Sequence, residues 1–164
     1  MNNTCIIVAD AGIARFYAIK PADAPRATLK LVELASLSNA GSDLRALGTS
    51  ASGRARTETN TDRGSGPVHP MEAQRERHRL ELDRRFGQEV ANRAAEASRG
   101  WKAGTIVLVA EPRLLGLLRE PLRKALHQRI ELKELAKDFT GLALQELQGR
   151  LESNKLLPRL DAAR

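Results

Sequence analysis

A long polar segment between two well-patterned regions constrains this chain more than any other feature of its sequence. The segment covers residues 37–70, and 20 of its 34 residues are Gly, Ser, Thr, Asn, Asp or Pro. Connections without secondary structure that exceed about 12–15 residues are uncommon in compact domains, where they are usually functional or disordered. We therefore expect a long flexible loop that runs directly into a strongly charged helical pattern.

Three short patterns before this loop indicate strands. Residues 5–9 form a continuous apolar run, which is typical of a central strand covered on both faces. Residues 15–20 form a second run that ends at Pro21, and residues 28–34 alternate between apolar and polar positions. Short turns join the three runs, with Asp10-Ala11-Gly12 as the first, so they predict an antiparallel meander.

The region after the loop alternates between helical and strand patterns. A long helix is predicted over residues 71–99, with Pro70 at its first position, where the missing N–H costs little. Its narrow apolar stripe consists of Leu82, Phe86, Val90, Ala94 and Ala97. Pro121 is expected to kink or split the next helix, which Pro112 opens. After the long helix, the sequence predicts a strand at 105–110 and then the helix that begins at Pro112. A strand at 130–135 and a helix at 142–151 follow.

A meander followed by helix, strand, helix, strand and helix is the order of a ribonuclease-H-like fold. It predicts one α/β domain over residues 1–152, with a mixed five-stranded sheet and helices on its faces. The loop at 37–70 belongs to this domain, whereas residues 153–164 are expected to form a loosely held tail. Neither an internal repeat nor a domain boundary is evident.

The amino-acid composition limits the kinds of molecule that the protein is expected to bind. Aromatic residues make up only 3% of the chain, which argues against recognition of RNA by stacking on aromatic sheet residues. The net charge of +7 favours an anionic partner, although a solvated basic surface explains it equally well. The only cysteine, Cys5, lies in an apolar run and is expected to be a buried structural thiol. The first residues lack a basic export signal and a membrane-length apolar run, so we expect a cytoplasmic protein without a membrane partner.

Three carboxylates suggest one catalytic alternative. Asp10 follows the first predicted strand and Glu111 the fourth, so both carboxylates reach the same sheet edge if those strands are parallel neighbours. Glu72 or Glu76, early in the long helix, is the candidate third ligand for Mg²⁺ in a metal-dependent nuclease. The alternative explanation involves no metal: Asp10 stabilises a turn, and Glu111 is an acid that precedes a helix.

Basic residues gather at two places that suit contact with phosphate. Residues 113–133 hold six basic residues against two acidic ones on a predicted helix and the strand after it. The end of the loop is basic and rich in glycine, but no Lys-Ser or Lys-Thr pair follows its glycines, so it is not a P-loop. Our candidate contact residues are Arg63, Gly64, Ser65, Gly66 and His69 in the loop, with Arg113 and Arg119 on the helix.

Four segments in the expected order carry a family resemblance. They are Val8-Ala9-Asp10-Ala11-Gly12-Ile13-Ala14-Arg15-Phe16-Tyr17, His69-Pro70-Met71-Glu72, Pro112-Arg113-Leu114-Leu115-Gly116-Leu117-Leu118-Arg119 and Lys137-Asp138-Phe139-Thr140. On these motifs the chain resembles the bacterial "protein required for attachment to host cells" family. That family is related to the middle domain of eukaryotic and archaeal peptide-chain release factors, so the resemblance implies a role near the ribosome or tRNA.

The resemblance does not extend to the release-factor reaction. In release factors the loop before the long helix carries a Gly-Gly-Gln tip that promotes hydrolysis of peptidyl-tRNA. Here the loop has Gly64-Ser65-Gly66, and Gln74 lies too far along the chain to replace the glutamine. We therefore expect a non-catalytic protein without cofactor or metal that binds the ribosome, tRNA or other structured RNA. The nuclease and a cell-surface attachment factor acting through protein contacts are the alternatives, and the oligomeric state is left open.

Overall fold

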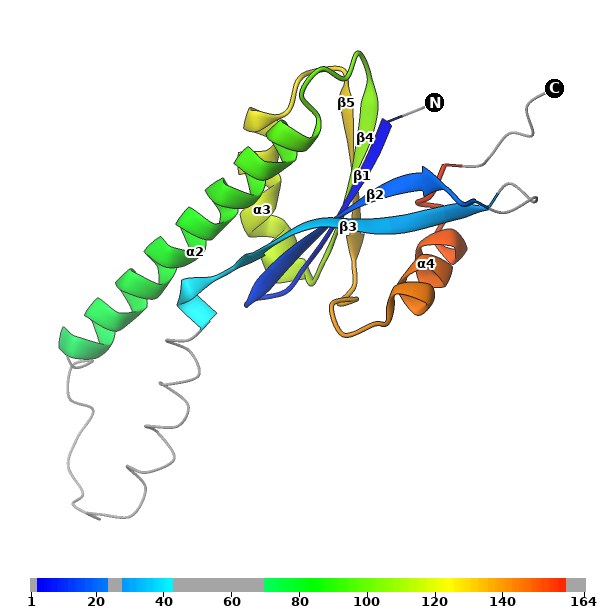
Figure 1. Cartoon of the computed structure of the whole chain (residues 1–164). Helices are drawn as coiled ribbons and strands as arrows, with labels where there is room; N and C mark the ends of the chain where they lie inside the picture. Colours follow the sequence, from blue (N-terminus) through cyan, green and yellow to red (C-terminus); the bar gives the residue numbers. More distant parts are fainter. Residues whose placement is uncertain (1–2, 24–27, 43–69, 159–164) are drawn as a thin grey trace.

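The computed structural model describes residues 3–23, 28–42 and 70–158, which form one α/β unit (Figure 1). A meander of β1 (Asn3–Ala9), β2 (Ile13–Pro21) and β3 (Leu29–Ser38) comes first. The elements that follow are α2 (Pro70–Ala97), β4 (Gly104–Ala110), α3 (Pro112–Ala125), β5 (Ile130–Ala136) and α4 (Leu144–Ser153). The predicted sequence of elements is therefore confirmed for the described residues.

The strands form one mixed sheet in the order β3-β2-β1-β4-β5. β1 pairs antiparallel with β2 and parallel with β4, and β5 continues the parallel half of the sheet. This sheet confirms the predicted fold class, and its strand order is compatible with the ribonuclease-H-like arrangement. The central strands β1 and β4 are buried over five consecutive residues each, as their continuous apolar sequences predict.

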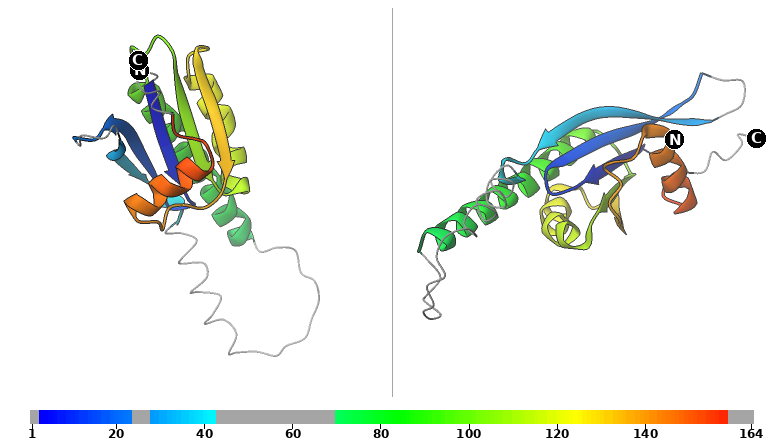
Figure 2. Two further views of the ribbon diagram at one scale, coloured as in Figure 1. Left: turned by 90° about the vertical axis from the view of Figure 1, so that its right-hand side faces the viewer. Right: turned by 90° about the horizontal axis from the view of Figure 1, so that it is seen from below.

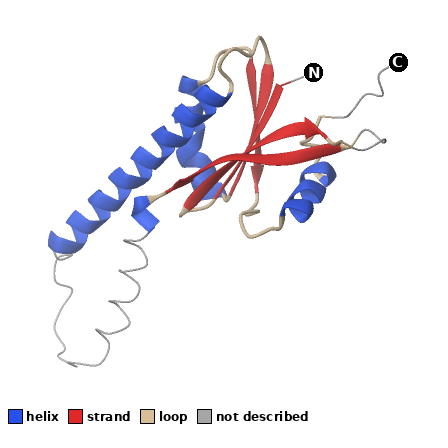
Figure 3. Ribbon diagram, in the orientation of Figure 1, coloured by secondary structure: helices blue, strands red, loops and turns tan. Residues whose placement is uncertain are grey.

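Helices cover both faces of the sheet, and each face has its own hydrophobic core. α2 and α3 pack on one face, whereas α4 lies on the other (Figures 2 and 3). Alternate residues of β1 serve the two cores, because Ile7 points into the first and Ile6 into the second. The Cys5 thiol is 1% exposed, and burial raises its pKa to about 12, so the expectation of a buried structural thiol is confirmed.

A β-bulge in β3 changes which residues face each core. Phe16 pairs with Ala35 and Tyr17 pairs with Glu33, so Leu34 is the extra residue and is 49% exposed. Leu31 therefore packs into the core under α4, while Leu37 packs against the core under α2. The predicted strand ended at Leu34, but β3 continues to Ser38, so that the first two residues of the predicted loop belong to the sheet.

The helices bear on two further details of the sequence prediction. α3 is not split at Pro121, which lies inside one helix with Leu118 and Leu122 fully buried on either side of it. α4 ends at Ser153, but the chain after it is not loose up to residue 158. Leu156 donates a backbone hydrogen bond to Leu151 and packs against the core under α4.

The long helix α2 begins at Pro70, as predicted, and has two unlike halves. Its buried residues all lie between Asp83 and Ala94, whereas its first turns extend past the edge of the sheet (Figure 1). Gly100, with φ 82°, reverses the chain after the helix in a conformation that favours glycine. The projecting half of α2 lies at the edge where the parallel strands β1 and β4 end.

Candidate nucleic-acid interface

A turn and a buried polar network define the sheet edge beside the projecting half of α2. Asp10 follows β1, and its Oδ1 accepts hydrogen bonds from the backbone N–H groups of Gly12 at 2.7 Å and Ile13 at 2.8 Å. This is an Asx turn, which confirms the turn predicted at Asp10. Gly12 in turn accepts a backbone hydrogen bond from Asn39 at 2.8 Å, which joins this turn to the end of β3.

Asn39 is the centre of the network and is only 4% exposed. Its Nδ2 donates to the Ala11 carbonyl at 2.8 Å and to Oδ1 of Asp83 at 2.9 Å. Its Oδ1 accepts from the N–H of Gly41 at 3.0 Å, as an N-cap does, where the chain begins a helical turn. Asp83 is 5% exposed, so a buried side-chain bond connects the start of the 43–69 segment to the middle of α2.

Gly41 lies so close to the side chains of Asp83 and Asn39 that little space is left for a side chain of its own. A Cβ at that position would lie 3.0 Å from Oδ1 of Asp83 and 3.2 Å from Oδ1 of Asn39. Such contacts are tighter than side chains normally allow, and both neighbours are fixed by hydrogen bonds. The network therefore holds β3 and α2 in one relative position at the base of the segment 43–69.

Residues 70–85 of α2, the projecting half and the turn after it, carry arginines of two kinds. Arg79 pairs with Glu76 at 3.1 Å and Arg85 pairs with Glu81 at 2.9 Å, both within the helix. Arg75, Arg77 and Arg84 make no ion pair or hydrogen bond from their side chains within the described residues, and all three are exposed. These unpaired guanidinium groups keep their full capacity to bind anions.

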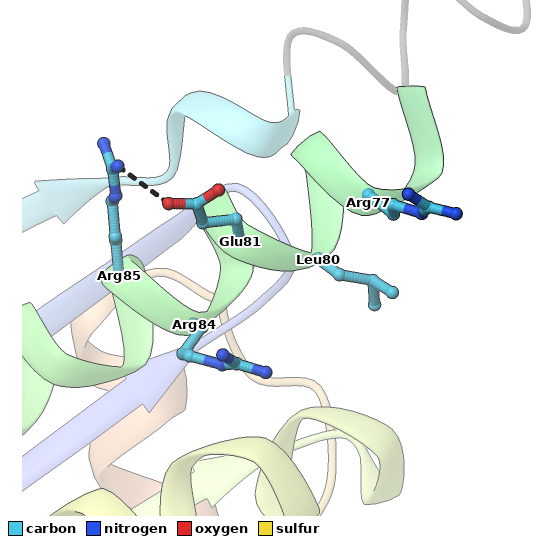
Figure 4. A pocket seen from close by; sticks show the side chains of 5 residues that line it. All are labelled: Arg77, Leu80, Glu81, Arg84 and Arg85. Carbon is cyan, nitrogen blue, oxygen red and sulfur yellow. Dashed lines mark hydrogen bonds and ion pairs between the residues drawn. The ribbon is translucent and has the colours of Figure 1, made fainter. Parts of the chain in front are cut away.

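Two of the unpaired arginines border a shallow open hollow on the flank of α2. Its volume is about 390 Å³, and Figure 4 shows the side chains that line it. Arg77, Leu80 and Arg84 follow each other at helical spacing and extend to the same side, and we call these three residues the arginine face. Arg85 and Glu81, which pair with each other, also line the hollow (Figure 4). Leu80 is 47% exposed between the two free cations.

The start of α3 adds a further free arginine at the same end of the molecule. A Cβ on Gly87 would meet the side chains of Leu117 and Leu118 at 3.6 and 3.7 Å, so α2 and α3 are in contact there. The two helices run in the same direction (Figure 1), and Arg84 and Arg113 each lie about one turn before this contact. Arg113 is exposed and has no side-chain partner in the described part of the chain.

Arg119, another predicted phosphate contact, is already engaged by an acid of β5. Its Nε and Nη2 donate to both carboxylate oxygens of Glu134 at 2.7–3.0 Å, a bidentate pair between α3 and β5. These hydrogen bonds lower the pKa of Glu134, and the charges of Arg119 and Arg123 act in the same direction. A role of Arg119 in binding phosphate stays a prediction. The predicted loop residues Arg63, Gly64, Ser65, Gly66 and His69 lie outside the described residues.

The carboxylates of the nuclease alternative only partly come together. Val8 pairs with Val109, so Asp10 and Glu111 follow at the same carboxyl edge, as the parallel strands predict. Glu72, however, is in the first turn of α2, about 16 Å before Asp83 along the helix axis. Within the residues that the structure describes, no three His, Cys, Asp or Glu side chains are grouped to hold a metal ion.

Sequence reasoning missed Arg77, Arg84 and the Asn39–Asp83 bond. Arg77 and Arg84 are seven residues apart with Leu80 between them, a spacing that marks one helix face. From its sequence the long helix looked laced with salt bridges, whereas three of its six arginines pair with an acid and three do not within the described residues. Nothing in the sequence indicates the Asn39–Asp83 bond, because 44 residues separate its partners.

The fold and this surface define an α/β protein with an exposed cationic end and no metal cluster among its described residues. Residues 5–151 match the family described as "Protein required for attachment to host cells", and the chain belongs to that family. The resemblance inferred from the sequence is confirmed to that extent. A search of curated proteins found no match. No helix in the described ranges is long and apolar enough to cross a membrane.

Proposed function

We propose that this member of the attachment family binds RNA, of the ribosome or of tRNA, through the end of the molecule where α2 projects. The observation that carries the proposal is that Arg77 and Arg84 line one hollow of α2 while Arg113 lies at the start of the neighbouring α3. All three arginines are exposed and have no acidic partner in the described chain. A merely solvated basic surface has its cations balanced by neighbouring acids, as Arg79 and Arg85 are on the same helix.

The sequence of the neighbouring loop supports the same end of the molecule. The basic, glycine-rich residues Arg63, Gly64, Ser65, Gly66 and His69 come directly before Pro70, the first residue of α2. The resemblance to the release-factor middle domain adds support for a partner in translation. The binding we propose is non-catalytic, because Gly64-Ser65-Gly66 lacks the glutamine of the release-factor tip.

Co-sedimentation with ribosomes at roughly 50 and 200 mM salt tests the proposal, because phosphate contacts weaken steeply as salt rises. We expect the protein in the ribosomal pellet at low salt and its release at high salt. The triple variant Arg77→Gln, Arg84→Gln, Arg113→Gln should stay in the supernatant at both salt concentrations. The absence of the unaltered protein from the pellet at low salt would refute the proposal for ribosomes.

A matched control separates a local surface from overall charge. Arg99, Lys102 and Arg129 are exposed at the opposite edge of the sheet, where β4 and β5 begin. Changing these three residues to Gln removes the same three charges and should leave sedimentation almost unchanged. Equal loss of binding in both triple variants would show that net charge alone drives the association.

A second candidate function rests on the family description, which names attachment to host cells. In that case the protein would act at the cell surface through protein contacts. Protease treatment of intact cells, followed by detection of the protein, distinguishes the two: a surface protein is degraded, whereas a pool inside the cell is protected. Complete protection would speak against direct adhesion.

A further inference from the structure

The arginine face of α2 differs from an ordinary cationic patch in having an apolar centre. Leu80 is 47% exposed between Arg77 and Arg84, and both arginines extend to the same side as the leucine (Figure 4). A surface that serves only to bind phosphate gains nothing from an exposed leucine in its middle. The combination instead suits a ligand that carries a flat apolar part next to negative charge.

Guanidinium groups are well matched to such a ligand. They are planar and weakly hydrated, so they stack on nucleobases as well as bind phosphate oxygens. The hollow, about 390 Å³ in volume, is open and shallow, so it admits one base while the rest of the strand stays outside. A single nucleotide, with one ring system and one or two phosphates, is a ligand of that kind.

We propose that the arginine face holds one unpaired nucleotide of an RNA strand. The base packs on Leu80 and the Arg84 guanidinium, while Arg77 and the nearby Arg113 bind the flanking phosphates. This inference rests on the proposed function and narrows it, because it names single-stranded or looped RNA as the recognised form.

Double-stranded RNA offers less to this surface. In an A-form duplex the faces of the bases are stacked on each other, so a protein meets phosphates and 2′-hydroxyl groups. Leu80 would then face a polar surface and stay without an apolar partner. Unpaired bases in loops and at strand ends expose their faces, and stacking on them contributes to affinity with little dependence on sequence.

An acidic peptide is the competing occupant, since it also satisfies arginines. The free guanidinium groups suit carboxylate and phosphate alike, so charge does not separate the two ligands. The exposed Leu80 does separate them, because an acidic peptide carries no ring next to each charge that would pack on it. Poly-glutamate therefore serves as a competitor in the test.

Fluorescence anisotropy of the full chain with a labelled single-stranded RNA, and with the same RNA in a duplex, tests the inference. The unaltered protein should bind the single strand on the order of tenfold more tightly than the duplex. Leu80→Ala and Arg84→Lys should each weaken single-strand binding by about fivefold or more, the lower end of base stacking, with duplex binding unchanged. Arg84→Lys is decisive, since it keeps the positive charge and removes the planar guanidinium group on which a base can stack.

Matched controls exist on the same molecule. Arg93→Lys changes an exposed arginine of α2 that is paired with Glu96 and does not line the hollow, and Leu144→Ala changes a 43%-exposed leucine on α4. Both should bind RNA like the unaltered protein. All four positions are at least partly exposed, so circular dichroism should show the same folded state for every variant.

The remaining outcomes decide between the two proposals. If RNA binds but Leu80→Ala and Arg84→Lys have no effect, the nucleotide site is refuted and the proposed function stands. If neither RNA form binds at low salt, the proposed function fails, and the inference fails with it. Displacement of the RNA by poly-glutamate or by inorganic phosphate at equal charge concentration would overturn the assignment of the site to a nucleotide.

Discussion

The two halves of α2 are one continuous helix but are stabilised in different ways. From Asp83 to Ala94 the helix buries Phe86, Val90 and their neighbours on the sheet. From Pro70 to Leu82 no residue is buried; Glu76 pairs with Arg79 within this half, and Glu81 pairs with Arg85 across the boundary. The packed half contributes buried side chains to the core of the fold, whereas the side chains of the projecting half are exposed and accessible to a partner.

The largest expected effect comes from the packed half. Phe86 is 2% exposed, and Phe86→Ala should lower the free energy of unfolding by about 3–5 kcal/mol, because it leaves a cavity between helix and sheet. Urea unfolding followed by circular dichroism measures this. Leu80→Ala in the projecting half is the control and should change stability by less than about 0.5 kcal/mol. If the two variants lost similar amounts of unfolding free energy, the two halves of α2 would not differ in their contribution to stability.

A smaller effect is expected at the boundary between the halves. Asn39→Ala removes the donor to the Ala11 carbonyl and to buried Asp83, so stability should fall by about 1–3 kcal/mol. The same unfolding experiment applies, with Asn92→Ala on the exposed side of α2 as control. An unchanged midpoint for Asn39→Ala would mean that the network does not hold β3 against α2.

The bond between α3 and β5 predicts a dependence on pH. Arg119 lowers the pKa of Glu134 in the folded protein, so the stabilisation is fully present above the pKa of an unfolded glutamate, about 4.3, and disappears as pH falls through the lower folded value. Arg119→Gln should therefore be less stable than the unaltered protein at pH 7, and the gap should close in acid. A gap that persists or widens below pH 3 would contradict this origin.

The smallest effect belongs to the ion pairs of the projecting half. Glu76→Gln removes the partner of Arg79 and should cost about 0.3–0.5 kcal/mol, since pairs of this kind are exposed and screened by salt. Thermal unfolding at low and high salt would show a small shift only at low salt. A loss above about 1 kcal/mol would mean that this half contributes more to the fold than its exposure indicates.

The sequence was sufficient to predict the sheet and the beginning of α2, because those depend on local patterns. Continuous apolar runs identify β1 and β4, and Pro70 marks the first turn of the helix. The features that it did not predict depend on contacts between distant residues. The Asn39–Asp83 bond joins partners 44 residues apart, and Arg119 finds its acid 15 residues away on another element.

The candidate site was predictable only in outline. Arg113 was identified from its charge and is exposed at the start of α3, the helix that contacts α2 at Gly87. Arg77 and Arg84 were not, because a row of arginines and glutamates does not reveal which acid each arginine selects. Arg79 uses Glu76 and Arg85 uses Glu81, and only this choice leaves the other arginines without a partner.

The bulge at Leu34 also determines what kinds of change the gene can tolerate here. Deleting this one residue would join Glu33 directly to Ala35, and regular alternation would keep Glu33 opposite Tyr17 and Ala35 opposite Phe16. Leu31 would still face the core under α4, and Leu37 the core under α2. Inserting one more residue between Leu31 and Leu37 would instead turn one of the two away from its core. Loss of a residue at the bulge should therefore be tolerated better than a gain, and substitutions at the exposed Leu34 should be tolerated as well.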